Sequence, residues 1–257
     1  MSVKAHKLND DTILKIREDY NKLKAKDIAE KYSCTVSQVY GVKRKFQELG
    51  YHLNTKISIT EFQKQILLGG ILGDGRLKKN GKFNVLYSEC HALGEQGYLQ
   101  WKFEHLGKLT QDTAIYDKNT NNSSNNAKEF STKTTPSLIP YYLLSKNIDK
   151  VIPQLNELGL IIDLLDDGWY QQSSQGRHLG SYCITAFQYT EKQRKLLSKQ
   201  WMNIAGVDFH NSGIKGVDLS ANQSETSKIA KIVLKYFPKN LDIIQKKFGE
   251  TFKLLNI

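Results

Sequence analysis

Two short acidic motifs, each ending in Asp-Gly, are the residues of this sequence best suited to chemistry. The first covers residues 66–75 and carries Asp74, and the second covers residues 160–168 and carries Asp167. In each motif an apolar run precedes a glycine that can end a helix, so the carboxylate lies at the end of a buried helix. A lone buried carboxylate would be costly. Two such helices packed side by side predict two carboxylates around one shared cation, the outline of a metal-dependent active site.

Paired carboxylates of this kind suit the hydrolysis of phosphodiesters. Without a cation two neighbouring carboxylates repel each other. Mg²⁺ prefers a few carboxylates together with water and phosphate oxygens, and it makes bound water more acidic. We therefore expect Mg²⁺ as cofactor, with Mn²⁺ as a substitute. Asp166, adjacent to Asp167, and the backbone of Gly73 are further possible ligands.

Composition restricts the partners. The 257 residues include 37 Lys and Arg against 26 Asp and Glu, a formal net charge of +11, which favours a polyanion, nucleic acid before membrane. No apolar run approaches the roughly 20 residues that span a bilayer, and no targeting peptide is evident at the polar N-terminus. Three widely spaced cysteines form neither a disulfide framework nor a zinc motif. We expect an intracellular, cytoplasmic protein, of a prokaryote or phage or within an organelle.

Residues 1–52 are predicted to form a separate helical module. Apolar residues recur at helical spacing, and residues 26–45 resemble a helix-turn-helix whose second helix would contact DNA. The turn lacks a glycine, so Ser33 or Cys34 must take the corner. The alternative is a three-helix cap that touches no DNA. The candidate DNA contacts of this module are Ser37, Gln38, Tyr40, Lys43, Arg44 and Lys45.

The remaining chain repeats one unit, over residues 57–145 and again over 146–257. Both stretches predict the order αββαββα, the second followed by a C-terminal helical extension, which makes the fold class α+β. The glycines of the first motif permit a close helix crossing. Their counterparts in the second motif are larger (Ile162, Asp163 and Asp166). We expect these to fill the space that glycine leaves; the alternative is a looser interface between the helices. Asp163 is expected to face solvent or a backbone partner.

The motifs and the repeat together resemble the LAGLIDADG homing endonucleases, over about residues 57–240. The most specific parts are residues 67–75 and the ending Asp166-Asp167-Gly168, and residues 150–153 fit the intron-encoded branch. The resemblance implies a monomer whose pseudo-twofold pair of αββαββα units forms an antiparallel-sheet saddle on the major groove of double-stranded DNA. It implies that Asp74 and Asp167 bind the metal. Basic residues near the cleavage centre would be Lys128 and Lys215, which begin matching strands, with Lys150 a third.

The saddle surface supplies further candidate DNA contacts. These are Arg76, Lys78, Lys82, Lys133, Gln171 and Arg177. The sequence therefore predicts a site-specific double-strand DNA endonuclease acting on a long asymmetric target. One alternative is a non-cleaving transcription regulator on the same scaffold, against which the retention of both acids argues. The other is a maturase that binds intron RNA.

Overall fold

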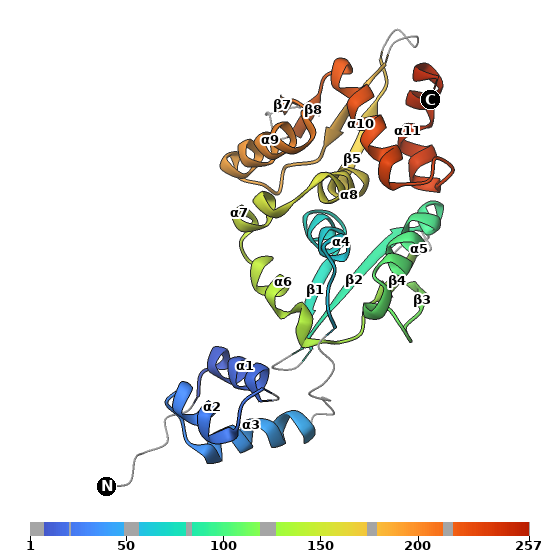
Figure 1. Ribbon diagram of the computed structural model, residues 1–257. Coiled ribbons are helices and arrows are strands. Elements are labelled where there is room, and N and C mark those ends of the chain that lie inside the picture. Colours follow the sequence, from blue (N-terminus) through green and yellow to red (C-terminus); the bar gives the residue numbers. More distant parts are fainter. Residues whose placement is uncertain are drawn as a thin grey trace. The chain divides into compact units, whose positions relative to one another are not determined.

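The chain divides into two compact units, Met1–Ile57 and Ser58–Ile257. A computed structural model describes residues 8–20, 22–48, 57–80, 84–118, 127–173, 179–212 and 218–256 (Figure 1). Within these ranges no helix combines the length and apolar character needed to cross a membrane.

Three helices form the first unit: α1 (Asp10–Asp19), α2 (Ala25–Lys31) and α3 (Val36–Glu48). Asn9 caps α1 by accepting a hydrogen bond from the Thr12 amide at 2.8 Å. The turn between α2 and α3 passes through Ser33, whose φ of 47° lies in the left-handed region. Ser33 therefore takes the corner where glycine is often found. The core of the unit is apolar and consists of Ile16, Ile28, Ala29, Val39 and Val42.

The second unit begins with one αββαββα half. It contains α4 (Glu61–Leu72), β1 (Arg76–Lys79), β2 (Val85–Ala92), α5 (Gln96–His105), β3 (Ile115–Lys118), β4 (Ala127–Ser131) and α6 (Ile139–Leu144), with short 3-10 turns at Leu93–Glu95, Gly107–Leu109 and Pro136–Leu138. The strands form an antiparallel sheet in the order β1-β2-β4-β3.

The other half repeats this order. After α7 (Ile148–Val151) and a 3-10 turn (Ile152–Gln154) come α8 (Glu157–Asp167), β5 (Gly168–Gln171), β6 (Ser181–Ile184), α9 (Glu191–Ala205), β7 (Phe209–Ser212), β8 (Asp218–Ala221) and α10 (Gln223–Tyr236). Helix α11 (Asp242–Leu255) follows. The second sheet has the equivalent order β5-β6-β8-β7. The predicted α+β class and the pair of antiparallel sheets are thus confirmed.

Alternation along the strands separates a covered face of each sheet from an open one. In β2 the side chains of Val85, Tyr87, Glu89 and His91 are buried, while the residues between them are partly exposed. Arg76 pairs with Ser88 in the antiparallel register, so its side chain projects from the open face. Lys78 lies two residues on and shares that face, which is where contacts to DNA were predicted.

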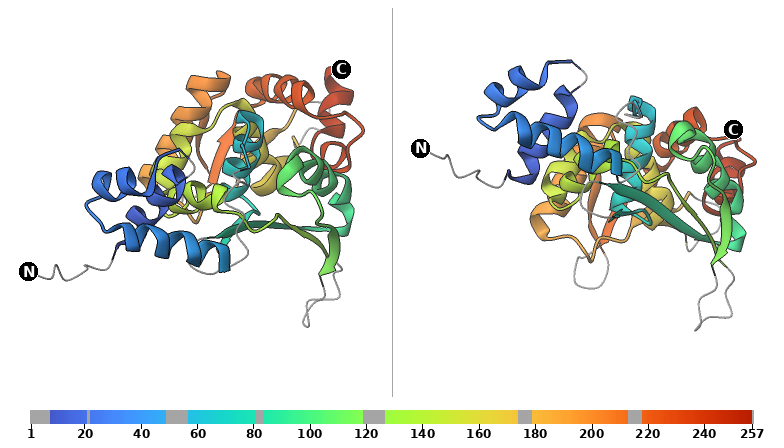
Figure 2. Two further views of the ribbon diagram at one scale, coloured as in Figure 1. Left: turned by 60° about the horizontal axis from the view of Figure 1, so that its bottom comes forward. Right: turned by 90° about the horizontal axis from the view of Figure 1, so that it is seen from below.

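The motif helices α4 and α8 lie side by side between the two sheets (Figures 1 and 2). Their crossing has no room for side chains at two glycines of α4. A Cβ added to Gly69 would stand 2.5 Å from the Gly159 carbonyl oxygen and 2.8 Å from Ile162. One added to Gly73 would stand 2.3 Å from the Asp166 Cβ. Larger residues of α8 therefore fill the space that the α4 glycines leave, as expected.

Candidate functional site

The crossing brings the acidic ends of both motif helices to one place. Asp74 follows the last turn of α4, and its backbone amide lies 3.4 Å from the Asp166 carboxylate of α8. Asp167 is the last residue of α8, and its carboxylate accepts a hydrogen bond from Gln188 at 3.1 Å. Asp74 and Asp167 thus end the two helices at the same end of the pair.

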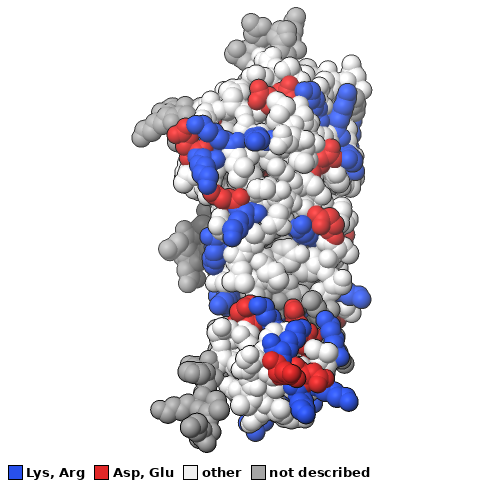
Figure 3. Space-filling model, turned by 60° about the vertical axis from the view of Figure 1, so that its left-hand side comes forward, with Lys and Arg blue, Asp and Glu red and all other residues white. Residues whose placement is uncertain are grey.

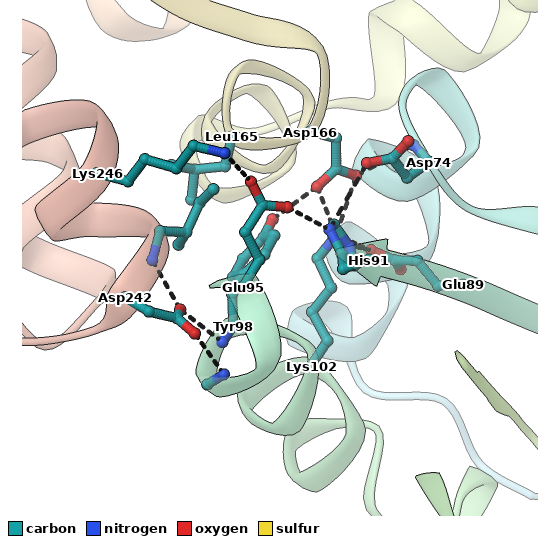
Figure 4. A network of polar contacts seen from close by, with 12 residues as sticks. Asp74, Glu89, His91, Glu95, Tyr98, Lys102, Leu165, Asp166, Asp242 and Lys246 are labelled. Atoms are coloured by element: carbon teal, nitrogen blue, oxygen red, sulfur yellow. Dashed lines mark hydrogen bonds and ion pairs between the residues drawn. The ribbon is translucent and has the colours of Figure 1, made fainter. Parts of the chain in front are cut away.

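Asp166 is part of a buried ionic network rather than a free carboxylate (Figure 4). The Lys102 ammonium of α5 lies 2.7 Å and 2.9 Å from its two oxygens, and the Tyr98 hydroxyl donates to it at 2.9 Å. Lys102 also pairs with Glu89, and the side chains of Lys102, Glu89 and Asp166 are fully buried. Although burial opposes it, Asp166 and Glu89 hold the pKa of Lys102 above its ordinary value. The Asp166 carboxylate is therefore already neutralised by a cation of the protein itself, the Lys102 ammonium.

His91 lies between this network and Asp74. Its Nε2 is 2.7 Å from Glu89, its Nδ1 is 3.1 Å from Glu95, and Nδ1 is 3.7 Å from Asp74. Burial lowers the pKa of His91, but the two glutamates outweigh it and raise that pKa to about 10. Both ring nitrogens consequently carry protons and donate.

These contacts show which side chains near Asp74 are free to bind a metal and which already have a partner in the protein. One atom each of Asp74, His91 and Asp166 lies within 4.8 Å of the others. An imidazolium has no lone pair to offer a metal, and Asp166 is occupied by Lys102. Of this cluster, that leaves Asp74 as the acid that accepts no hydrogen bond from a cationic side chain in the described structure. Asp167, next to Asp166, accepts only the neutral Gln188 amide among the described contacts.

The protonation behaviour of these two acids is alike. Burial raises the pKa of Asp74 to about 6, and the nearby Asp166 carboxylate adds to the rise. Burial and Asp166 also raise the pKa of Asp167 to about 6. Two partly buried carboxylates that resist ionisation, both oxygen donors, fit a hard divalent cation such as Mg²⁺.

Comparisons with known proteins show which family has this fold. The model of the LAGLIDADG DNA endonuclease family matches residues 64–216, which is more than half of the chain. The chain belongs to the LAGLIDADG DNA endonuclease family. Among curated proteins, a protein RecA of Mycolicibacterium flavescens is 34% identical over 62 residues, which make up 23% of this chain and only 15% of that protein.

Solved structures that match this LAGLIDADG protein include homing endonucleases and a LAGLIDADG domain. The homing endonuclease I-WcaI bound to its DNA recognition sequence shares the fold, with a TM-score of 0.60 at 13% identity, covering 78% of this chain and 90% of that chain. Mesophilic variants of the homing endonuclease I-DmoI have a TM-score of 0.38 at 17% identity, covering 68% of this chain and 95% of theirs. The N-terminal LAGLIDADG domain of DUF199/WhiA has a TM-score of 0.40 at 14% identity, and the match covers 74% of this chain and 86% of that chain.

The predicted basic residues of this LAGLIDADG protein lie at different places in the structure. Lys128, the second residue of β4, forms an ion pair with Asp117 at 2.7 Å and by register stands opposite His91, the neighbour of Asp74. Lys150 lies in α7, before the N-terminus of α8, so a helix of about 16 Å separates it from Asp167. Lys215 falls outside the described residues.

The predicted DNA contacts of the sheets are placed as follows. Arg76 and Lys78 are exposed on the open face of the first sheet, and Gln171 is exposed at the end of β5. Lys133 pairs with Asp112 at 2.9 Å. Lys82 and Arg177 lie outside the described residues. On the face drawn in Figure 3, basic side chains lie among acidic ones, so the positive charge is not continuous there.

In the N-terminal unit, α3 presents some of the predicted residues to solvent. Ser37, Tyr40 and Arg44 are exposed, Tyr40 by 54%. The Lys43 ammonium lies 4.9 Å from the centre of the Tyr20 ring. Gln38 has a structural role, because its side-chain oxygen accepts the Thr35 amide at 2.8 Å and so caps α3. The side chain of Lys45 is outside the described part of the structure.

Two features of the site differ from the sequence analysis. Asp163 was expected to face solvent or a backbone partner; instead it is fully buried in α8, and neither carboxyl oxygen has a hydrogen-bond partner in the described structure. Besides α4, helix α8 packs against α9, α10 and β6 of its own half, which no local sequence pattern shows. The network of Glu89, His91 and Lys102 was not predicted. The one signal in the sequence was a strand whose buried positions 85, 87, 89 and 91 end in two ionisable residues.

Proposed function

We propose that this LAGLIDADG protein is a site-specific endonuclease that hydrolyses both strands of a long, asymmetric double-stranded DNA target. The observation that carries the proposal is the pair Asp74 and Asp167. Each ends a motif helix of the family, and burial raises the pKa of each to about 6. The open faces of the two sheets, with Arg76 and Lys78 on the first, support DNA as the substrate.

The proposed roles follow from the contacts. Asp74 and Asp167 would hold the metal. Bound Mg²⁺, or Mn²⁺ in its place, would stabilise charge on the phosphate and make the attacking water more acidic. His91 orients Asp74 from behind, and Gln188 orients Asp167. Asp166 and Lys102 form a neutral pair that keeps the helix ends together. Lys128 and Lys215 stay proposed contacts near the scissile phosphates.

The partners proposed are double-stranded DNA and no second copy of the chain. Both motif helices are present in one chain and pack against each other, so one molecule contains a complete crossing. A non-cleaving regulator is the second candidate, because the first unit has the helix order and the left-handed turn at Ser33 of a helix-turn-helix. Retention of Asp74 and Asp167 favours the nuclease.

A cleavage-site selection from a randomised DNA library, followed by assays on a supercoiled plasmid, tests the proposal. We expect wild type to linearise the plasmid in magnesium and not in chelator. Asp74→Asn and Asp167→Asn should each abolish linearisation, leaving at most a nick, because both acids hold one metal cluster. Binding should persist, since Asn keeps the shape and removes a negative charge that faces phosphate. Tight binding by wild type without cleavage in magnesium or manganese would establish the regulator instead.

A further inference from the structure

Helix α11 follows the second repeated unit yet contacts both halves of the nuclease body. The order from α8 to α10 already completes αββαββα, whereas after α6 the chain continues through the short α7 into α8. In the described chain, α11 is therefore an element present after one half only. Its buried residues Ile243, Ile244, Phe248 and Phe252 anchor it in the core.

On the first half, α11 caps the start of α5. Asp242 accepts the backbone amides of Gly97 at 2.6 Å and Tyr98 at 3.0 Å, and Lys246 pairs with Glu95 at 2.7 Å (Figure 4). The residue before α5 supplies no side-chain cap of its own. Free amides at a helix start need such an acceptor. Helix α5 carries the Tyr98 and Lys102 side chains that contact Asp166. By capping α5, Asp242 therefore helps to hold these two side chains in place.

On the second half, α11 caps the end of the motif helix α8. The Lys247 ammonium donates to the carbonyl oxygens of Leu165 and Gly168, both at 2.5 Å. These carbonyls flank Asp166 and Asp167, and without a donor they would be unpaired. The corresponding end of α4 is capped differently: the Leu72 carbonyl accepts the hydroxyl of Tyr189 at 2.9 Å.

We propose that α11 braces the two halves and that Lys247 is a positioning residue for the metal-binding end of α8. The inference rests on the proposed endonuclease and adds a residue that acts through Asp167. Because Lys247 fixes the end of α8 and Tyr189 fixes the end of α4, removal of the Lys247 ammonium displaces Asp167 more than Asp74. The cleavage rates of the two DNA strands then fall by different factors.

Hydrogen exchange in the free, full-length protein tests the brace without requiring activity. Lys247→Met should speed exchange in the last turn of α8 on the order of tenfold and leave the last turn of α4 unchanged. Lys253→Met, an exposed lysine of the same helix, is the control and should change neither. If Lys247→Met does not fold, Asp242→Ala is the second variant. It should speed amide hydrogen exchange at the start of α5. Unchanged exchange in these segments overturns the brace.

Strand-resolved cleavage of an end-labelled duplex tests the positioning role. In Lys247→Met one strand should be cut ten- to a hundredfold more slowly, on the order of the effect of a misplaced reacting group. The other strand should be nearly unaffected, so nicked product accumulates, while DNA binding in calcium is kept. Equal slowing of both strands overturns the positioning role. If wild type fails to cut its selected site, the proposed function fails, and the exchange measurement still decides the brace.

Discussion

Three aspartates of one helix turn in α8 have three different electrostatic situations. Asp167 is partly buried at the C-terminal end and accepts a neutral amide, Asp166 is paired with a buried ammonium, and Asp163 is buried with no partner in the described structure. The spacing i, i+3, i+4 puts all three along one side of the helix. Their protonation differs because the residues packed against that side differ from one turn to the next.

Asp163 should make the metal-free protein less stable at high pH. Burial, with Asp167 and Asp166 nearby, raises its pKa well above the ordinary value. An acid whose folded pKa is raised contributes stability below its unfolded pKa, about 3.9, and loses it as pH rises toward the folded pKa. Asp163→Asn should therefore raise the free energy of unfolding at about pH 8 and change it little at about pH 4. Urea denaturation in chelator measures both; an equal effect at the two pH values would contradict the assignment.

Breaking the Asp166–Lys102 pair should destabilise the fold. Asp166→Asn removes one partner of the buried Lys102 ammonium, and breaking a buried pair typically lowers the free energy of unfolding by about 3–5 kcal/mol. Because Lys102 keeps Glu89 as a partner, we expect a decrease at the lower end of that range. Asp167→Asn, at the C-terminal end of α8 and without an ionic partner among the described contacts, serves as the matched control and should cost far less. The measurement is chemical denaturation of both variants without metal. A similar small decrease in both would mean that Asp166 is not held by a buried ion pair.

Most elements could be predicted from the sequence, because apolar periodicity and turn residues are local signals. The two motif helices, the repeated order of elements in each half and a corner at Ser33 or its neighbour were all predicted. The network around Lys102 could not be, since its members come from β2, α5 and α8 and meet only through tertiary packing. The role of α11 was hidden for the same reason: Lys247 contacts residues about 80 positions earlier in the chain.

The N-terminal unit is expected to add DNA contacts beyond those of the sheets. Residues 1–52 carry 11 Lys and Arg against 7 Asp and Glu, and α3 presents Ser37, Tyr40 and Arg44 to solvent. Deleting residues 1–52 should shorten the footprint and weaken binding without moving the cleavage position. For every phosphate that the shortened protein no longer neutralises, the slope of log affinity against log salt should become shallower by roughly 0.9. An identical footprint and salt slope would show a cap that does not touch DNA.

At the scale of the whole molecule, the two repeated αββαββα halves share a fold but not the groups around their acids. Strand register makes Gly75 equivalent to Gly168, so Glu89 corresponds to Ile184 and His91 to Ala186. Both counterparts are fully buried and apolar. Asp74 is consequently backed by an imidazolium within a charged network. Asp167 has apolar residues at the equivalent strand positions, a neutral amide as hydrogen-bond donor, and the Lys247 ammonium on the neighbouring carbonyls.

The different surroundings of Asp74 and Asp167 predict that the two DNA strands are cut one after the other. The acids share one cluster, but each scissile phosphate lies nearer one half, so the different surroundings should give rates that differ roughly tenfold, or about 1.4 kcal/mol in activation free energy. A supercoiled plasmid bearing the selected target should pass through a nicked circle before linear product appears. Inverting the target in the plasmid should move the first nick to the other plasmid strand, because the bound orientation decides it. Linear product without a nicked intermediate would show that the two halves, despite their different buried residues, cut with equal rates.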